Sequence, residues 1–305
     1  MIMLSSLRRT VLPGLTTLAL LTSASQAQQV FSSPEDAAAA LAAAVKSGSS
    51  SAIEKVLGKD AEDIVASGDE VADAETLKRF TAAYDARHSI KAEGDKKATM
   101  ILGNDDFPFP IPLYKIKSGW EFDAAEGRRE ILYRRIGRNE LDAIQTCLAY
   151  VDAQNEYAEK DRGEGAGVYA QRVVSSPGKK DGLFWRDDGE PSPLGEFAAE
   201  ASSEGYKLEG KGAPYHGYYF RILKGQGSDA PGGALNYVVK GKMIGGFALI
   251  AYPAEYGNSG VMTFMVNHAG TVYQKDFGKR TDFIARRIIQ FDPDQTWKKA
   301  DVAAP

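Results

Sequence analysis

The sequence predicts an α+β protein in two parts, because the residue pattern changes along the chain. Before residue 88, apolar residues recur with the helical period, and Ser33-Pro34 provides a helix start. After residue 160, short β-branched and aromatic runs alternate with turn residues, and fifteen of the 31 glycines lie between Gly205 and Gly278. This spacing is typical of antiparallel strands. We therefore expect helices and a small sheet first, then a long helix packed on an antiparallel β-meander.

The first part is expected to be a helical layer followed by a short meander. Helices are predicted over 34–46, 52–57, 60–66 and 73–88, the last with Leu77, Phe80 and Tyr84 on one stripe. Strands are predicted over 98–102, 112–117 and 119–122. The combination loosely resembles the cone-shaped nuclear-transport-factor-like (NTF2-like) and cystatin-like folds. That is a fold analogy, and it carries no function with it.

The second part is expected to begin after a break in a helix. A helix from Glu126 to Arg135 should stop near Gly137, a candidate left-handed cap, and Asn139 should cap the next helix. Apolar residues then recur at spacings of three and four on one face of that helix. They are Leu141, Ile144, Leu148 and Val151. We place the domain boundary in this break, which gives domains 28–136 and 137–305.

The remainder of the second part is expected to be strands, closed by one helix. Short apolar runs between turn residues predict the strands 215–223, 235–239, 247–252, 261–266 and 271–275. A final helix is predicted over 281–289, with Phe291 and Trp297 anchoring the tail to the core.

The first 27 residues have the pattern of a cleaved signal peptide. Arg8 and Arg9 precede a short apolar run, Thr10 to Leu21, and Ser25-Gln26-Ala27 is a small-x-small cleavage site. The run is well below the roughly 20 residues that span a bilayer. We expect a periplasmic or secreted protein exported by a Sec-type signal and cut after Ala27, with twin-arginine export as the alternative. No transmembrane segment is expected in the mature chain.

Charge and cysteine content narrow the possible partners. Without Arg8 and Arg9 the chain has 35 basic and 41 acidic residues, and no run of like charge argues for a nucleic-acid partner. Cys147 is the only cysteine, which leaves no intramolecular disulfide even in an oxidising compartment. The packed core must therefore supply the stability. The oligomeric state is not indicated.

Gly257-Asn258-Ser259-Gly260 looks like the surroundings of a nucleophilic serine. The strained nucleophile elbow requires glycine two residues after serine and a helix beyond it. Here Gly260 follows Ser259 directly and a strand comes next, whereas all four residues are turn formers. We therefore expect a bend between two strands, and we expect no catalytic residue in the chain.

The three histidines and one acidic loop are the remaining candidates for chemistry. His88, His216 and His268 are too far apart for a local metal motif, so no metal or cofactor is expected. His216 lies among aromatic residues in "PYHGYYF", where it is either packed or in contact with a ligand. The loop 181–190 holds Asp181, Asp187, Asp188 and Glu190. Paired carboxylates there could hydrolyse a glycan, although a solvated acidic rim is the simpler interpretation.

Aromatic residues beside loops give the positive indication of binding. Exposed aromatic faces can stack on sugars or meet a protein partner. The candidate binding residues are Trp185, Tyr215, His216, Tyr218 and Tyr219. In the alternative interpretation, these side chains fill the core from alternate strand positions.

Four stretches together resemble a secreted bacterial family, domain-of-unknown-function family 2950. They are "RIGRNELDAIQTCLAYVDAQNEY", "GLFWRDDGEPSPLG", "GYYFRILKGQG" and "GGFALIAYPAEYGNSGVMTFMVNHAGTVYQKDFG". The resemblance covers nearly the whole mature chain and implies an exported protein, but no activity. Residues 139–278 also resemble the globular headgroup of type IV pilin-like proteins. The chain lacks the continuous hydrophobic N-terminal helix of true pilins.

These observations favour an exported, non-catalytic cell-envelope protein that acts by surface contact with a protein or glycan partner. The alternative is a periplasmic envelope hydrolase that uses the acidic loop 181–190 or His216. A third possibility is an architectural subunit of an assembly.

Overall fold

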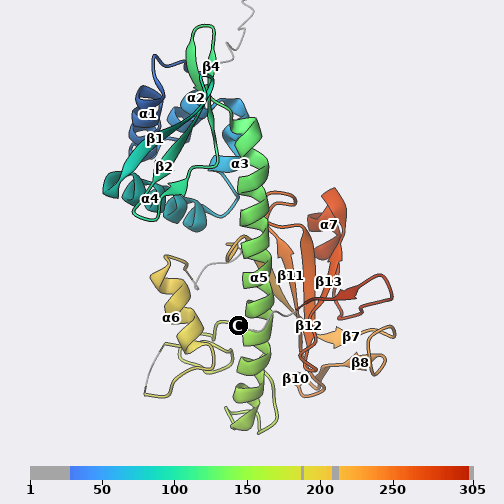
Figure 1. Cartoon of the computed structure of the whole chain (residues 1–305). Coiled ribbons are helices and arrows are strands. Elements are labelled where there is room, and N and C mark those ends of the chain that lie inside the picture. The colour runs from blue at the N-terminus through green and yellow to red at the C-terminus, as the bar shows by residue number, and fades with distance from the viewer. Residues whose placement is uncertain (1–27, 187–188, 208–212, 302–305) are drawn as a thin grey trace, which may run out of the picture.

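A computed structural model describes residues 28–186, 189–207 and 213–301, so the predicted signal peptide lies outside the described residues. Figure 1 shows one long helix, α5 (Ala124–Glu159), as the axis of the molecule. A unit of helices and strands lies at one end of α5, and a second sheet lies along its other half. The protein therefore has the predicted α+β class.

The N-terminal unit begins with a layer of short helices. These are α1 (Pro34–Lys46), α2 (Ser50–Leu57), the 3-10 turn η1 (Lys59–Ala61), α3 (Glu62–Val65) and α4 (Glu70–Ala86). Ser33 caps α1 as predicted, since its hydroxyl accepts the Asp36 N–H. Helix α4 begins at Glu70 rather than at Asp73, because the Asp69 carboxylate accepts the Val71 and Ala72 N–H groups. The predicted stripe on α4 does face the core of this unit.

An antiparallel sheet closes the N-terminal unit. Its strands are β1 (His88–Glu93), β2 (Lys97–Leu102), β3 (Phe107–Pro108), β4 (Leu113–Ile116) and β5 (Gly119–Phe122). They run in the order β1-β2-β4-β5, with β3 also paired to β2. The hairpin β4–β5 is confirmed. Strand β1 was not predicted, because it is exposed at every position except the half-buried Ile90 and so has no alternating apolar pattern.

Helix α5 runs without interruption through the predicted break, so the expectation of two helices is wrong. Gly137 lies in its interior with open space around it, and Asn139 is buried inside the helix instead of capping one. A glycine in a helix costs only about 1 kcal/mol, which packing at both ends of α5 overrides. The predicted face is confirmed at three of its four positions, because Ile144 and Val151 are buried and Leu148 packs against the same core, whereas Leu141 is 52% exposed. The buried side chains include Ala143, Cys147, Tyr150, Gln154 and Tyr157.

The C-terminal sheet is antiparallel, as predicted. It consists of β6 (Tyr218–Leu223), β11 (Ala248–Pro253), β12 (Met262–Asn267), β13 (Tyr273–Asp276) and β14 (Lys298–Lys299). Their order is β14-β13-β12-β11-β6. Two short ribbons accompany the sheet. They are β7 (Gly225–Gln226) with β8 (Leu235–Asn236), and β9 (Val238–Val239) with β10 (Lys242–Met243). The predicted strand 235–239 therefore lies outside the sheet, divided between β8 and β9 of these two separate ribbons.

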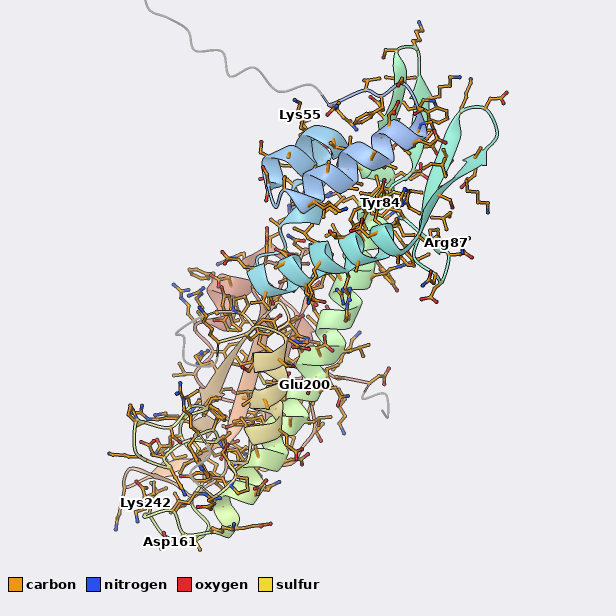
Figure 2. All side chains as sticks on the ribbon, turned by 90° about the vertical axis from the view of Figure 1, so that its left-hand side faces the viewer. Lys55, Tyr84, Arg87, Asp161, Glu200 and Lys242 are labelled. Atoms are coloured by element: carbon orange, nitrogen blue, oxygen red, sulfur yellow. The ribbon has the colours of Figure 1, made fainter. Side chains whose placement is uncertain are left out.

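Helices cover both faces of this sheet. Helix α5 packs on β11 and β12, and α7 (Thr281–Ala285), which follows the turn η2 (Gly278–Arg280), packs on the other face (Figure 1). Helix α7 is shorter than the predicted 281–289. Helix α6 (Gly195–Ser203) was not predicted, and it lies on the side of α5 away from the sheet. Figure 2 looks from that side and shows α6, marked by Glu200, in front of α5.

Two hydrophobic clusters lie on α5, one in each unit. The fully buried members of the first run from Phe31 to Ala124, and those of the second run from Ala143 to Trp297. Phe291 and Trp297 are buried in the second cluster, which confirms that they anchor the tail. Between the clusters α5 passes through a layer of polar contacts.

Arg135 ties the two units together within that layer. Its Nη1 donates to the Asp63 carbonyl at 2.7 Å and to Asn258 Oδ1 at 2.6 Å. Its Nη2 donates to the Ile64 carbonyl at 2.6 Å. The Asn258 amide in turn donates to the Ala66 carbonyl at 2.9 Å. One guanidinium on α5 therefore binds the α3 segment of the first unit and a turn of the second.

We predict that Arg135→Ala lowers the free energy of unfolding by about 2–3 kcal/mol, because three half-buried acceptors lose their charged donor. Arg134→Ala is the matched control. Its side chain is 53% exposed, pairs with Glu130 on the same helix and lies 5.8 Å from the centroid of the exposed Phe107 ring, so the expected change is below about 1 kcal/mol. Chemical denaturation of the natural protein and the two variants measures both changes in unfolding free energy. Equal losses in the two variants would contradict the role given to Arg135.

Candidate functional site around His216

Two of the five candidate binding residues lie in the core. Trp185 is 7% exposed and its indole N–H donates to the Glu190 carbonyl, while Tyr218 is fully buried and its hydroxyl donates to the Met262 carbonyl. The expectation of exposed rings is therefore wrong for these two. Both side chains fill the core, as the other interpretation held.

The remaining candidates are half-buried and lie on different faces of the sheet. Tyr219 points to the α7 face, where its ring meets Tyr252 at 5.5 Å between centroids and Arg286 at 6.0 Å. Tyr215 and His216 lie beside α6 instead. Tyr215 contacts Phe197 at 5.2 Å and Tyr206 at 4.8 Å. We refer to Phe197, Tyr206, Tyr215 and Phe220, which are all half-buried, as the aromatic group.

A tight turn positions His216 next to the aromatic group. Tyr215 and Tyr218 exchange both backbone hydrogen bonds, at 2.8 and 3.0 Å, across a two-residue loop. His216 has φ +47° and Gly217 has φ +74°. Positive φ at both central residues defines a type I′ hairpin turn. The turn directs the imidazole towards α5 and the end of α6.

His216 is held between two carboxylates. Its Nδ1 lies 2.7 Å from Asp142 Oδ2 on α5, and its Nε2 lies 2.8 Å from Glu204 Oε2 at the end of α6. Burial alone would lower the pKa of His216. The hydrogen bonds and negative charges of Asp142 and Glu204 outweigh burial and raise the pKa from 6.5 to about 9. The imidazole is therefore a cation at neutral pH, with both N–H groups donating.

The backbone next to His216 is fixed by a buried carboxylate of the N-terminal unit. Asp69 is 1% exposed, and its Oδ2 accepts the Gly217 N–H at 2.8 Å and the Tyr206 O–H at 2.9 Å. A Cβ at position 217 would lie 2.5 Å from Asn139 Nδ2 and 2.9 Å from Ser259 Cβ. Only glycine fits there. The site therefore includes both units and α5.

Sequence reasoning missed the partners of His216. Asp69, Asp142, Glu204 and Tyr206 belong to segments that come together only in the folded chain, and Asp142 is 74 residues from His216. The one local signal was the histidine-glycine pair in "YHGY", which is compatible with a two-residue hairpin turn and could have predicted the turn but not the partners of His216.

Ser259 forms a bend, as predicted. Its side chain is buried, and its Oγ accepts the Glu255 N–H at 2.9 Å and lies 3.2 Å from the Glu255 carbonyl. The Gly257 N–H donates to the Gly260 carbonyl at 2.8 Å, which closes the bend. The hydroxyl is thus used by the backbone of its own turn.

The acidic loop is engaged in structural contacts where it is described. Burial would raise the pKa of Asp181, but hydrogen bonds from the Ser176 N–H and hydroxyl lower it. The hydrogen bond from Lys180 lowers the pKa of Glu190. A general acid at neutral pH needs a raised pKa, so neither carboxyl is suited to that role. Asp187 and Asp188 lie outside the described residues.

Two kinds of feature are absent from residues 28–186, 189–207 and 213–301. Within them, no group of three or more His, Cys, Asp and Glu side chains could hold a metal ion. In the same residues, no helix combines the length and apolarity needed to cross a bilayer.

We predict that the His216 ion pairs stabilise the fold at neutral but not at alkaline pH. A pKa that rises from 6.5 to about 9 on folding contributes stability that is complete below pH 6.5 and lost as pH rises through about 9. His216→Asn removes the titration and tolerates the positive φ. The difference in unfolding free energy between the natural protein and this variant should shrink over that window.

His88→Asn is the control, because the His88 ring contacts only the Tyr84 carbonyl among the hydrogen-bond partners described. A difference that does not change with pH would contradict the assignment.

Comparison with known proteins gives a family. No curated protein and no solved structure matches the chain. Residues 28–300 match the family described as a protein of unknown function (DUF2950), which covers nearly all of the chain that follows the predicted signal peptide. The chain therefore belongs to the DUF2950 family.

Proposed function

We propose that this chain is an exported cell-envelope protein that acts without catalysis, by surface contact with a glycan or protein partner. The observation that carries the proposal is the aromatic group, whose rings are half-buried and mutually packed around Tyr215. A ring held by its neighbours loses little conformational entropy on binding, which makes it an efficient contact. The expected signal peptide at residues 1–27 supports export.

The surroundings of the aromatic group favour a glycan. Burial first, and then the negative charges of Glu204, Glu200 and Asp142, raise the pKa of Tyr215. The ring thus lies beside carboxylates that can accept sugar hydroxyl groups, while aromatic faces stack on the apolar faces of sugar rings. Asp69 and the type I′ turn hold this surface in place, because they fix the backbone on which Tyr215 lies.

The candidate catalytic groups support a non-catalytic role. The Ser259 hydroxyl is used within its own turn, and His216 is held as a cation between two carboxylates. A protonated imidazole cannot accept a proton from a nucleophile. Each group therefore has a structural role in the described residues.

We predict that Tyr215→Ala and Phe197→Ala weaken binding to purified envelope glycan by about threefold to tenfold each, the effect of losing one packed aromatic contact. Tyr133→Ala is the matched control, because Tyr133 is 78% exposed on α5 outside this surface. Co-sedimentation with insoluble glycan measures binding, and thermal denaturation shows that the variants are folded. Unchanged binding in both aromatic variants, or an equal loss in Tyr133→Ala, would refute the proposed surface. If the aromatic variants kept glycan binding but no longer bound an envelope protein, the partner would be a protein instead of a glycan.

One contact favours the second candidate, an envelope hydrolase that uses His216. The imidazole lies 2.7 Å from Asp142, a geometry that can orient a histidine for proton transfer. The two candidates make different predictions for one variant. A hydrolase should lose at least about a hundredfold in glycan cleavage on His216→Asn. The binding protein should show no cleavage in either form, and it should keep its glycan binding at pH 6 if the variant is folded.

A further inference from the structure

A second surface, on the α7 side of the C-terminal sheet, is unlike the rest of the chain in charge. Residues 279–289 carry four basic and one acidic side chain, whereas the remaining residues carry 33 basic and 40 acidic ones. We refer to Lys279, Arg280, Phe283, Arg286, Arg287 and Ile289 as the cationic face, and all six are exposed. Figure 1 shows α7 on the side of the sheet opposite α5.

The cationic face exposes apolar side chains among its charges. Phe283 is 49% exposed and Ile289 is 73% exposed. The Arg287 guanidinium lies 3.4 Å from the centroid of the Phe283 ring, and that of Arg280 lies 5.3 Å from it. The exposed ring is thus bracketed by two cations.

The face is fixed to the sheet from behind. Thr281 and Ala285 are buried, and Arg221 on β6 donates to the Ala285 and Ile288 carbonyls at 2.8 and 2.5 Å. These bonds satisfy the carbonyl of the last residue of α7 and one in the segment that follows, and so they hold the outward side chains in place. Phe283 and Ile289 therefore stay exposed because the inner positions of the segment are already occupied.

A groove extends the apolar area next to Ile289. It measures about 320 Å³. Its apolar lining comes from β12, α7 and the segments that follow β13 and α7, and its polar lining is Lys275, Gln290, Asp292 and Asp294. Ile284 and Ile288 lie along the groove, and the rings of Phe277 and Trp297 face them. Lys275 lies over both rings, at 5.0 and 5.8 Å from their centroids. The groove therefore has a cation, Lys275, beside its rings, and its carboxylates Asp292 and Asp294 lie beyond the cationic face in sequence.

We propose that the cationic face binds the surface of an anionic phospholipid bilayer. Lys and Arg side chains are attracted to anionic headgroups, and exposed aromatic and aliphatic side chains enter the boundary between headgroups and acyl chains. A hydrated polyanion would satisfy the charges alone, whereas Ile289 gains only where acyl chains are available. The inference does not depend on the proposed glycan contact, because the aromatic group lies beside α6 and the cationic face lies across the sheet.

The test is co-sedimentation of the purified exported protein with vesicles of phosphatidylglycerol and phosphatidylethanolamine, compared with neutral phosphatidylcholine vesicles. We expect binding only to the anionic vesicles, weakened by salt. Arg280→Glu with Arg287→Glu should lower it by about tenfold or more, since each charge near the surface contributes substantially. The matched control is Lys91→Glu with Lys96→Glu, which makes the same charge change at exposed positions of the β1–β2 hairpin. It should lower binding less than about twofold.

A second pair of variants tests the apolar part separately. Phe283→Ser with Ile289→Ser keeps the charges, so the variant should still bind vesicles at low salt. At high salt it should be released fully, whereas the natural protein should be released only in part because its apolar side chains remain inserted. Thermal denaturation confirms that each variant is folded. Absence of binding to anionic vesicles, or equal losses in both charge-reversal pairs, would overturn the proposal. The charge-reversal variant could instead bind vesicles as well as the natural protein does, while it no longer self-associates or no longer binds an acidic protein. Either result would also overturn the proposal.

Discussion

The structure depends on helix α5 passing unbroken from one hydrophobic cluster to the other. Its N-terminal turns pack on the first unit and its C-terminal turns pack on the second sheet. Between them, Arg135 and Asn139 face turns of both units and donate to backbone and side-chain acceptors there. If the helix ended at Gly137, these donors would lose their positions. The polar layer, and with it the site around His216, would not form.

The same layer explains why the candidate site is structured although it lies on loops. Asp69 comes from the cap of α4, Asp142 from α5 and His216 from a type I′ turn. Each element is fixed by its own core, so their meeting point is fixed as well. Two surfaces are then displayed on opposite sides of the C-terminal unit, an aromatic one beside α6 and a cationic one beside α7.

The sequence revealed elements with local signals and missed those set by long-range contacts. The β-meander and the hairpin β4–β5 were predictable because apolar runs and turn residues alternate there. The break at Gly137 was wrong because a weak local preference gave way to packing at both ends of α5. The expectation that Trp185 is exposed was wrong, because strand and loop patterns do not show which side of a segment the rest of the chain covers. The pairing of His216 with Asp142 and Glu204 had no local pattern.

Hydrogen exchange at the α5 amides of residues 134–142 tests the central claim most directly. These amides lie between the two clusters and include the stretch around Gly137 where the sequence suggests a break. A continuous helix held by both units predicts protection as strong as that of residues 144–151, which pack on the second sheet. Fast exchange confined to 134–142, with strong protection on either side, would show two separate helices and contradict the account.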